Sequence, residues 1–104
     1  MFIKLTLFVV TLLLSSKVHA HFPTLSCETK AGDKSTLHCL AGYSDASLAS
    51  EAKLNVYSYD EELLSTLTTA TDGTVSFAMP KGEFYIVFDP GHESPAEFDY
   101  AELE

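Results

Sequence analysis

The 104-residue sequence contains no arginine, and its six lysines are outnumbered by fifteen aspartate and glutamate residues. Its formal net charge is −9 at pH 7. Such an acidic chain repels the phosphates of nucleic acids and anionic lipid surfaces, because these carry charge of the same sign. The composition therefore excludes both as partners and leaves metal cations and basic proteins.

Catalytic signatures are also lacking. The sequence has no glycine-rich phosphate loop, no His-Glu-x-x-His motif and no serine elbow of a Ser/His/Asp triad. The adjacent carboxylates Asp60, Glu61 and Glu62 fall in an expected turn, where water would solvate them. A small domain also has little room for a ligand pocket of the usual ~300 Å³ or more. We therefore expect a protein that is not an enzyme.

The apolar run from Leu5 to Leu14 is well short of the roughly 20 residues that span a bilayer. It follows Lys4 and precedes Val18-His19-Ala20, whose residues at positions −3 and −1 suit signal peptidase. We expect residues 1–20 to be a signal peptide cleaved between Ala20 and His21, with a retained anchor as the alternative. Residues 21–104 would then form one periplasmic or secreted domain, with four lysines against fifteen acidic residues and a formal charge of −11.

Only two cysteines occur, Cys27 and Cys39. In a small exported chain an even pair of cysteines predicts a disulfide. Closing a loop of about a dozen residues contributes roughly 3 kcal/mol to stability in the chain-entropy model. Their spacing is not Cys-x-x-Cys, and two thiols alone do not complete a zinc site. A structural bridge is therefore favoured over a redox or metal role.

Apolar residues alternate with a period of two between frequent turn signals, which predicts an all-β, antiparallel, Ig-like sandwich of about seven strands. Asp72-Gly73 predicts a type I′ hairpin turn, and the apolar faces of 83–89 predict a central strand covered on both sides. A helix over 45–54 or 60–67 is the competing interpretation. The expected strands are 24–29, 35–43, 52–59, 63–70, 74–79, 83–89 and 97–103.

The stretch AKLNVYSYDEELLSTLTTATDGTVSFAMPKGEFYIVFDPGH, residues 52–92, resembles carboxypeptidase-regulatory-like and transthyretin-like small sandwiches. Its closing Asp-Pro-Gly-His, residues 89–92, is similar to a segment of bacterial periplasmic domains associated with nickel and cobalt uptake. Those domains also often begin with histidine directly after a signal peptide. The chain departs from that segment in having Pro90 before Gly91 and Glu93 after His92. The resemblance implies a sandwich fold and a role accessory to metal uptake.

Cleavage after Ala20 would make His21 the first residue of the exported chain. The α-amine and the imidazole Nδ1 of a terminal histidine close a six-membered chelate ring on one metal ion. These nitrogen donors suit Cu(II) or Ni(II), and the resemblance adds Co(II). Pro23 has no N–H, so amide chelation cannot continue past Phe22. Further ligands would come from His92, His38 or the carboxylates Asp89, Glu93 and Glu28.

The sequence therefore predicts an exported module that captures or passes on Ni(II), Co(II) or Cu(II), with a membrane metal permease as a further partner. Neutral imidazole and amine would bind the ion, and their protonation in acid would release it. The alternative is a metal-free interaction module that docks a protein through an exposed strand edge or through an aromatic face formed by Tyr57, Tyr59, Tyr85 and Tyr100. Placement of His21 and His92 at opposite ends of the sandwich would favour this alternative.

Overall fold

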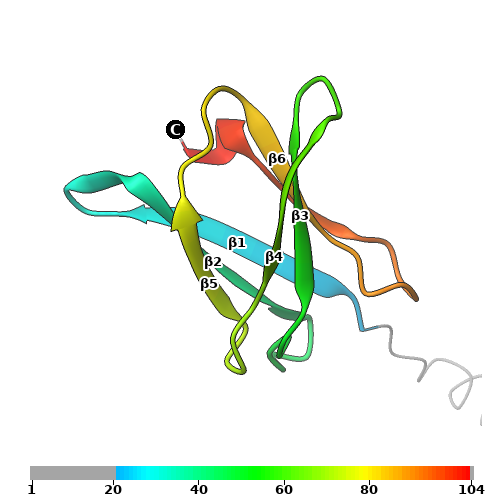
Figure 1. Ribbon diagram of the computed structural model, residues 1–104. Helices are drawn as coiled ribbons and strands as arrows, with labels where there is room; N and C mark the ends of the chain where they lie inside the picture. The colour runs from blue at the N-terminus through cyan, green and yellow to red at the C-terminus, as the bar shows by residue number, and fades with distance from the viewer. Residues whose placement is uncertain (1–20, 104) are drawn as a thin grey trace, which may run out of the picture.

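A computed structural model describes residues 21–103 as seven strands followed by a single 3-10 turn, with no α-helix in that range (Figure 1). The predicted signal peptide, residues 1–20, lies outside the described residues, as does Glu104. In the described part of the chain, no helix has the length and apolar character to span a membrane. The elements are β1 (Pro23–Lys30), β2 (Asp33–Tyr43), β3 (Lys53–Ser58), β4 (Leu63–Thr68), β5 (Thr74–Ala78), β6 (Phe84–Phe88), β7 (Ala96–Asp99) and η1 (Tyr100–Leu103).

The strands form two antiparallel sheets, one of order β1-β2-β5 and the other of order β4-β3-β6-β7. Both competing helical interpretations are wrong, because residues 45–54 are mainly loop and residues 63–68 pair with β3. The prediction of an all-β sandwich of seven strands is confirmed.

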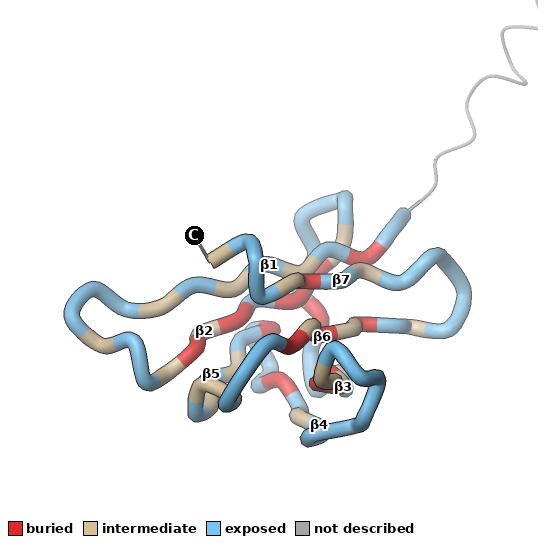
Figure 2. The backbone as a smooth tube through the Cα atoms, turned by 90° about the horizontal axis from the view of Figure 1, so that it is seen from above, coloured by how far each residue is buried: buried red, intermediate tan, exposed pale blue. Residues whose placement is uncertain are grey.

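The core lies between the sheets and follows the period-two pattern of the strands (Figure 2). Successive side chains of a strand point to opposite faces of its sheet. Burial accordingly alternates through the middle of β2, in β3 and along the whole of β6. Phe84, Leu37, Leu54, Ile86 and Val56 are the largest fully buried side chains.

The disulfide prediction is confirmed. Cys27 of β1 lies directly opposite Cys39 of β2, with 4.1 Å between their Cα atoms, and the two are bridged. The bridge therefore joins two strands of the same sheet, and Cys39 contributes to the core.

The prediction of a type I′ turn at Asp72-Gly73 is wrong. A type I′ turn needs positive φ at both central residues, but only Gly73 has it, at +82°. The N–H of Gly73 donates to the carbonyl of Ala70, and the N–H of Ala70 donates to the carbonyl of Thr74. This is a three-residue loop, beyond which β4 and β5 diverge into different sheets.

Two further expectations need correction. The strand predicted over residues 97–103 ends at Asp99, because Asp99 accepts the N–H of Ala101 and Glu102 accepts the N–H of Asp99, a reciprocal cap that starts η1. Strand β6 is central in its sheet, but within residues 21–103 no second layer covers its outer face (Figure 1). There Tyr85 is half-buried, and its ring stacks on that of Tyr57.

Candidate metal-binding site

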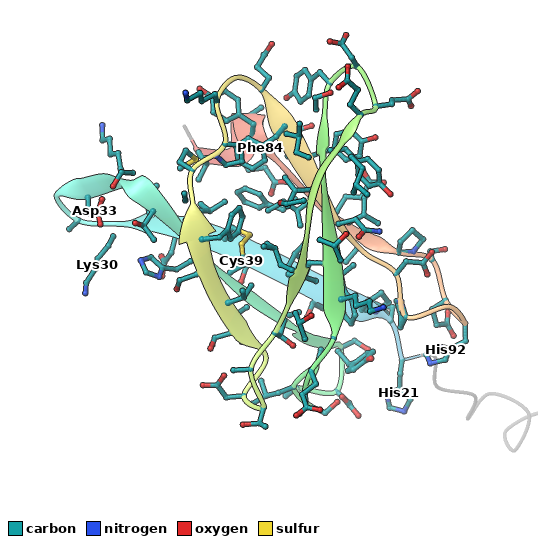
Figure 3. The ribbon with its side chains drawn as sticks, viewed as in Figure 1. His21, Lys30, Asp33, Cys39, Phe84 and His92 are labelled. Carbon is teal, nitrogen blue, oxygen red and sulfur yellow. A yellow bond between two sulfur atoms is a disulfide. The ribbon has the colours of Figure 1, made fainter. Side chains whose placement is uncertain are left out.

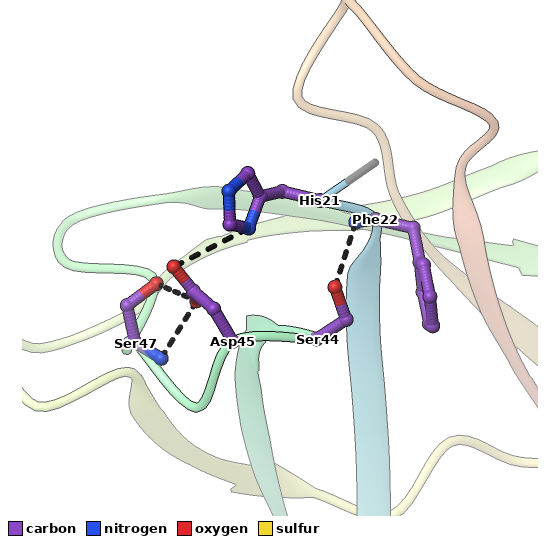
Figure 4. Close-up of polar contacts among 5 residues, drawn as sticks. All are labelled: His21, Phe22, Ser44, Asp45 and Ser47. Carbon is purple, nitrogen blue, oxygen red and sulfur yellow. Dashed lines mark hydrogen bonds and ion pairs between the residues drawn. The ribbon is translucent and has the colours of Figure 1, made fainter. Parts of the chain in front are cut away.

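His21 lies where the chain enters β1, next to the loop that follows β2. The N–H of Phe22 donates to Ser44 Oγ at 3.1 Å, and the N–H of Ser44 donates to the Phe22 carbonyl at 2.8 Å (Figure 4). These bonds continue the β1–β2 pairing past Pro23 and Tyr43. The backbone beside His21 is therefore held against the β2–β3 loop.

That loop presents Asp45 to the His21 ring. His21 Nδ1 lies 3.4 Å from Asp45 Oδ2. The other oxygen, Asp45 Oδ1, accepts the N–H of Ser47 at 3.0 Å and the Ser47 hydroxyl at 2.6 Å. The carboxylate is thus oriented by Ser47, with Oδ2 directed toward the imidazole (Figure 4).

The electrostatics keep Asp45 ionised. The hydroxyl and the N–H of Ser47, and to a smaller extent the nearby His21, lower the pKa of the Asp45 carboxyl. The His21 and Asp45 side chains are 61% and 43% exposed, so an ion in solution can reach both. The pair therefore offers one imidazole nitrogen and one anionic oxygen at an open end of the sandwich.

His92 lies in the β6–β7 loop, at the same end of the sandwich as His21 (Figure 3). Its neighbours Asp89 and Gly91 bond to each other, the Gly91 N–H donating to Asp89 Oδ1 at 2.9 Å. Across residues 21–103, no three His, Cys, Asp or Glu residues gather closely enough to hold a metal ion. Within residues 21–103, the side chains therefore supply two candidate ligands that lie together, His21 and Asp45.

His38 lies on the outer face of the β1-β2-β5 sheet and points in the opposite direction to Cys39, which is buried. Its Nδ1 bonds to Ser76 Oγ at 2.6 Å, whereas its buried Nε2 has no partner among the described residues. Glu28 is the cross-strand neighbour of His38. At ~3.3 Å per residue, the seven positions from His21 to Glu28 along the chain span about 23 Å. Neither His38 nor Glu28 can therefore share an ion with His21.

Asp45 was not among the ligands expected from the sequence, although a signal for it exists. A direct bridge between Cys27 and Cys39 sets the hairpin register, and six further positions along each strand bring residue 21 opposite residue 45. The Asp-x-Ser sequence of residues 45–47 is a further signal, because an aspartate in this pattern accepts the N–H of the serine two residues later and so has a fixed orientation.

Comparisons with known protein families, with curated proteins and with solved structures find no match to this chain. The resemblance of residues 52–92 to transthyretin-like sandwiches stays a prediction. The functional proposal below therefore rests on the donor atoms of His21 and Asp45 and on the distance between them.

Proposed function

We propose that the protein is an exported binding module that captures a transition-metal cation, Ni(II), Co(II) or Cu(II), at His21 and Asp45. The observation that carries the proposal is the 3.4 Å approach of His21 Nδ1 to a carboxylate oxygen that Ser47 holds in place. Two donors that bind one ion at ~2.1 Å and at right angles lie about 3 Å apart. The two side chains therefore need only a small adjustment to share an ion.

The third donor is the amino group that cleavage after Ala20 would release on His21. This amine and Nδ1 form the chelate ring, and Asp45 adds an anionic oxygen that reduces the net charge of the bound ion. The bond from the Phe22 N–H to Ser44 Oγ holds the first peptide unit in position, so little ordering remains to be done on binding. Protonation of the amine and the imidazole releases the ion at acidic pH.

The position of His92 supports the same function. Its loop lies at the same end of the sandwich as His21 (Figure 3). Placement of the two histidines at opposite ends would have favoured a metal-free module. An exposed histidine at the same end of the sandwich as the proposed ion is suited to ligand exchange, in which the ion passes to another protein such as a membrane metal permease.

Isothermal titration of the exported protein with Ni(II), Co(II) and Cu(II) tests the proposal, after mass spectrometry has confirmed a start at His21. Four alanines placed before His21 move the amine away from the ring, and this variant should bind Ni(II) at least roughly tenfold more weakly. Asp45→Asn keeps an oxygen that accepts the Ser47 bonds but loses the anionic donor, and we expect a loss of about tenfold.

Asp72→Asn is the matched control. Asp72 occupies an equivalent Asp-x-Thr turn, accepting the N–H and the hydroxyl of Thr74, with no histidine recorded beside it in the described residues. Its substitution makes the same change in net charge and should leave the affinity unchanged. Equal affinity of the wild type and the alanine-extended variant would remove the terminal chelate, and equal effects of the two Asp→Asn substitutions would remove Asp45.

A further inference from the structure

The outer face of the β4-β3-β6-β7 sheet carries aromatic and acidic side chains in register. Tyr57 of β3 pairs with Tyr85 of β6, and Tyr85 pairs with Asp99 of β7. In the next row, Val87 of β6 pairs with Glu97 of β7. These side chains all point away from the core, because Val56, Ile86 and Phe98 of the same strands are buried.

The aromatic part of this face is ordered. The rings of Tyr57 and Tyr85 stack with their centroids 5.3 Å apart and their planes 22° from parallel. Tyr59, just beyond β3, donates its hydroxyl to Asp99 Oδ1, a bond that raises the pKa of Tyr59 to about 12 and lowers the pKa of Asp99. Tyr100, predicted to join this patch, instead packs its ring against Phe84.

A shallow groove of about 600 Å³ lies in this face. It runs from the turn after β3 to the edge strand β7 and is open to solvent. Its lining consists of Tyr59, Asp60, Glu61, Tyr85, Glu97 and Asp99.

The four carboxylates of the groove have no basic partner within the described residues. The ion pair found within residues 21–103 joins His21 to Asp45, at the other end of the protein from the groove. None of the lysines in that range lies within 4.0 Å of a described carboxylate. An aromatic surface with unneutralised carboxylates attracts organic cations, because ring faces and carboxylates both favour positive charge.

We infer that this face, which we call the tyrosine groove, docks an extended, arginine- or lysine-rich segment of a partner protein. This goes beyond the proposed metal site and does not depend on it. Charge complementarity identifies the partner, since the groove is anionic in a domain of formal charge −11. Guanidinium groups stack on tyrosine rings and pair with carboxylates at the same time.

The dimensions of the groove suit an extended chain. Carboxylates flank the tyrosines on two sides, Asp60 and Glu61 beyond β3 and Glu97 and Asp99 on β7. Because β6 separates β3 from β7, the axes of these two strands are about 10 Å apart. In an extended segment, side chains on one face recur every ~7 Å, so alternating basic residues reach both sides while the backbone crosses the rings.

Fluorescence anisotropy with a labelled peptide in which four arginines alternate with glycines tests this inference. The titration uses the exported protein with EDTA present, so that the metal site makes no contribution. Glu61→Gln with Glu97→Gln should weaken binding roughly tenfold. The control Glu28→Gln with Glu51→Gln makes the same change in net charge outside the groove and should weaken binding less than about threefold.

Tyr59→Leu removes an exposed ring without changing the charge at neutral pH, and we expect about a threefold loss of affinity. The same peptide with glutamine in place of arginine should not bind. Similar losses in the two double variants, or unchanged binding by Tyr59→Leu, would show that the peptide responds only to net charge and would overturn the inference. Circular dichroism of each variant verifies that its sheets are intact.

Discussion

Single residues define the turns of this sandwich, and Gly73 shows how two requirements combine at one position. Its φ of +82° is a left-handed backbone conformation, which is strained for any residue that carries a Cβ. A Cβ at this position would also lie 2.5 Å from the carbonyl oxygen of Ala41, whose N–H bonds to the carbonyl of Gly73. The β4–β5 loop therefore packs directly on the backbone of β2, and only glycine fits there.

Gly73→Ala should lower the free energy of unfolding by at least about 2 kcal/mol, since the backbone strain and the clash act together. The control is Gly82→Ala. Gly82 has nearly the same φ, +83°, but no atom lies within 4 Å of its added Cβ. This control should lose about 1 kcal/mol from strain alone. Urea unfolding of both variants measures the difference, and equal losses would show that the contact with Ala41 is relaxed at little cost.

At the scale of elements, the β1–β2 hairpin connects the candidate metal site to the core. Its two strands pair from Pro23 and Tyr43 to Lys30 and Asp33. Cys27 and Cys39 bridge them near the middle, and Cys39 is buried among core residues. The same pairing, continued outward, places His21 beside Asp45. The register of this one hairpin thus determines both the bridge and the site.

Replacing Cys27 and Cys39 together by alanine should lower the free energy of unfolding by about 3 kcal/mol, because the unfolded chain gains the entropy of an open loop. Urea unfolding with and without a reducing phosphine measures the loss. The wild type should lose a similar amount on reduction, whereas the double variant should not respond to the reductant. A loss below about 1 kcal/mol would mean that the backbone pairing alone holds the hairpin.

At the scale of the whole molecule, negative charge dominates. Several aspartates nevertheless have lowered pKa values, because neighbouring hydroxyl and N–H groups stabilise their charged form. Ser35 acts in this way on Asp33, Ser47 on Asp45 and Thr74 on Asp72. A lowered pKa in the folded state contributes stability above the ordinary value of 3.8. That contribution is lost as the pH falls through the lower folded pKa.

We therefore expect the urea midpoint to fall as the pH is lowered from about 4 to about 2. Protonation of the other carboxylates relieves repulsion over the same range, so the measurement needs about 0.5 M NaCl to screen that effect. Asp33→Asn with Asp72→Asn keeps both turns but removes two of the titrating groups. This variant should show a smaller fall, and a fall equal to that of the wild type would assign the acid sensitivity to other groups.

The sequence by itself determined the strand pattern and the disulfide. Period-two burial and a two-cysteine pair are properties of local spacing, so β1 to β6 lie within a few residues of their predicted ranges. The turn type was not determined by the local sequence. A type I′ turn was predicted at Asp72-Gly73, but the divergence of β4 and β5 into separate sheets selects a different loop.

Only the tertiary structure decided which side chains meet. His21 lies beside Asp45 because two strand ends far apart in the chain share one hairpin register. Tyr59, Tyr85 and Asp99 line one groove because β3, β6 and β7 are neighbours in one sheet. Such contacts depend on which strands pair across long intervals of sequence. Residue periodicity carries no information about that choice, because alternate sheet orders bury the same apolar residues.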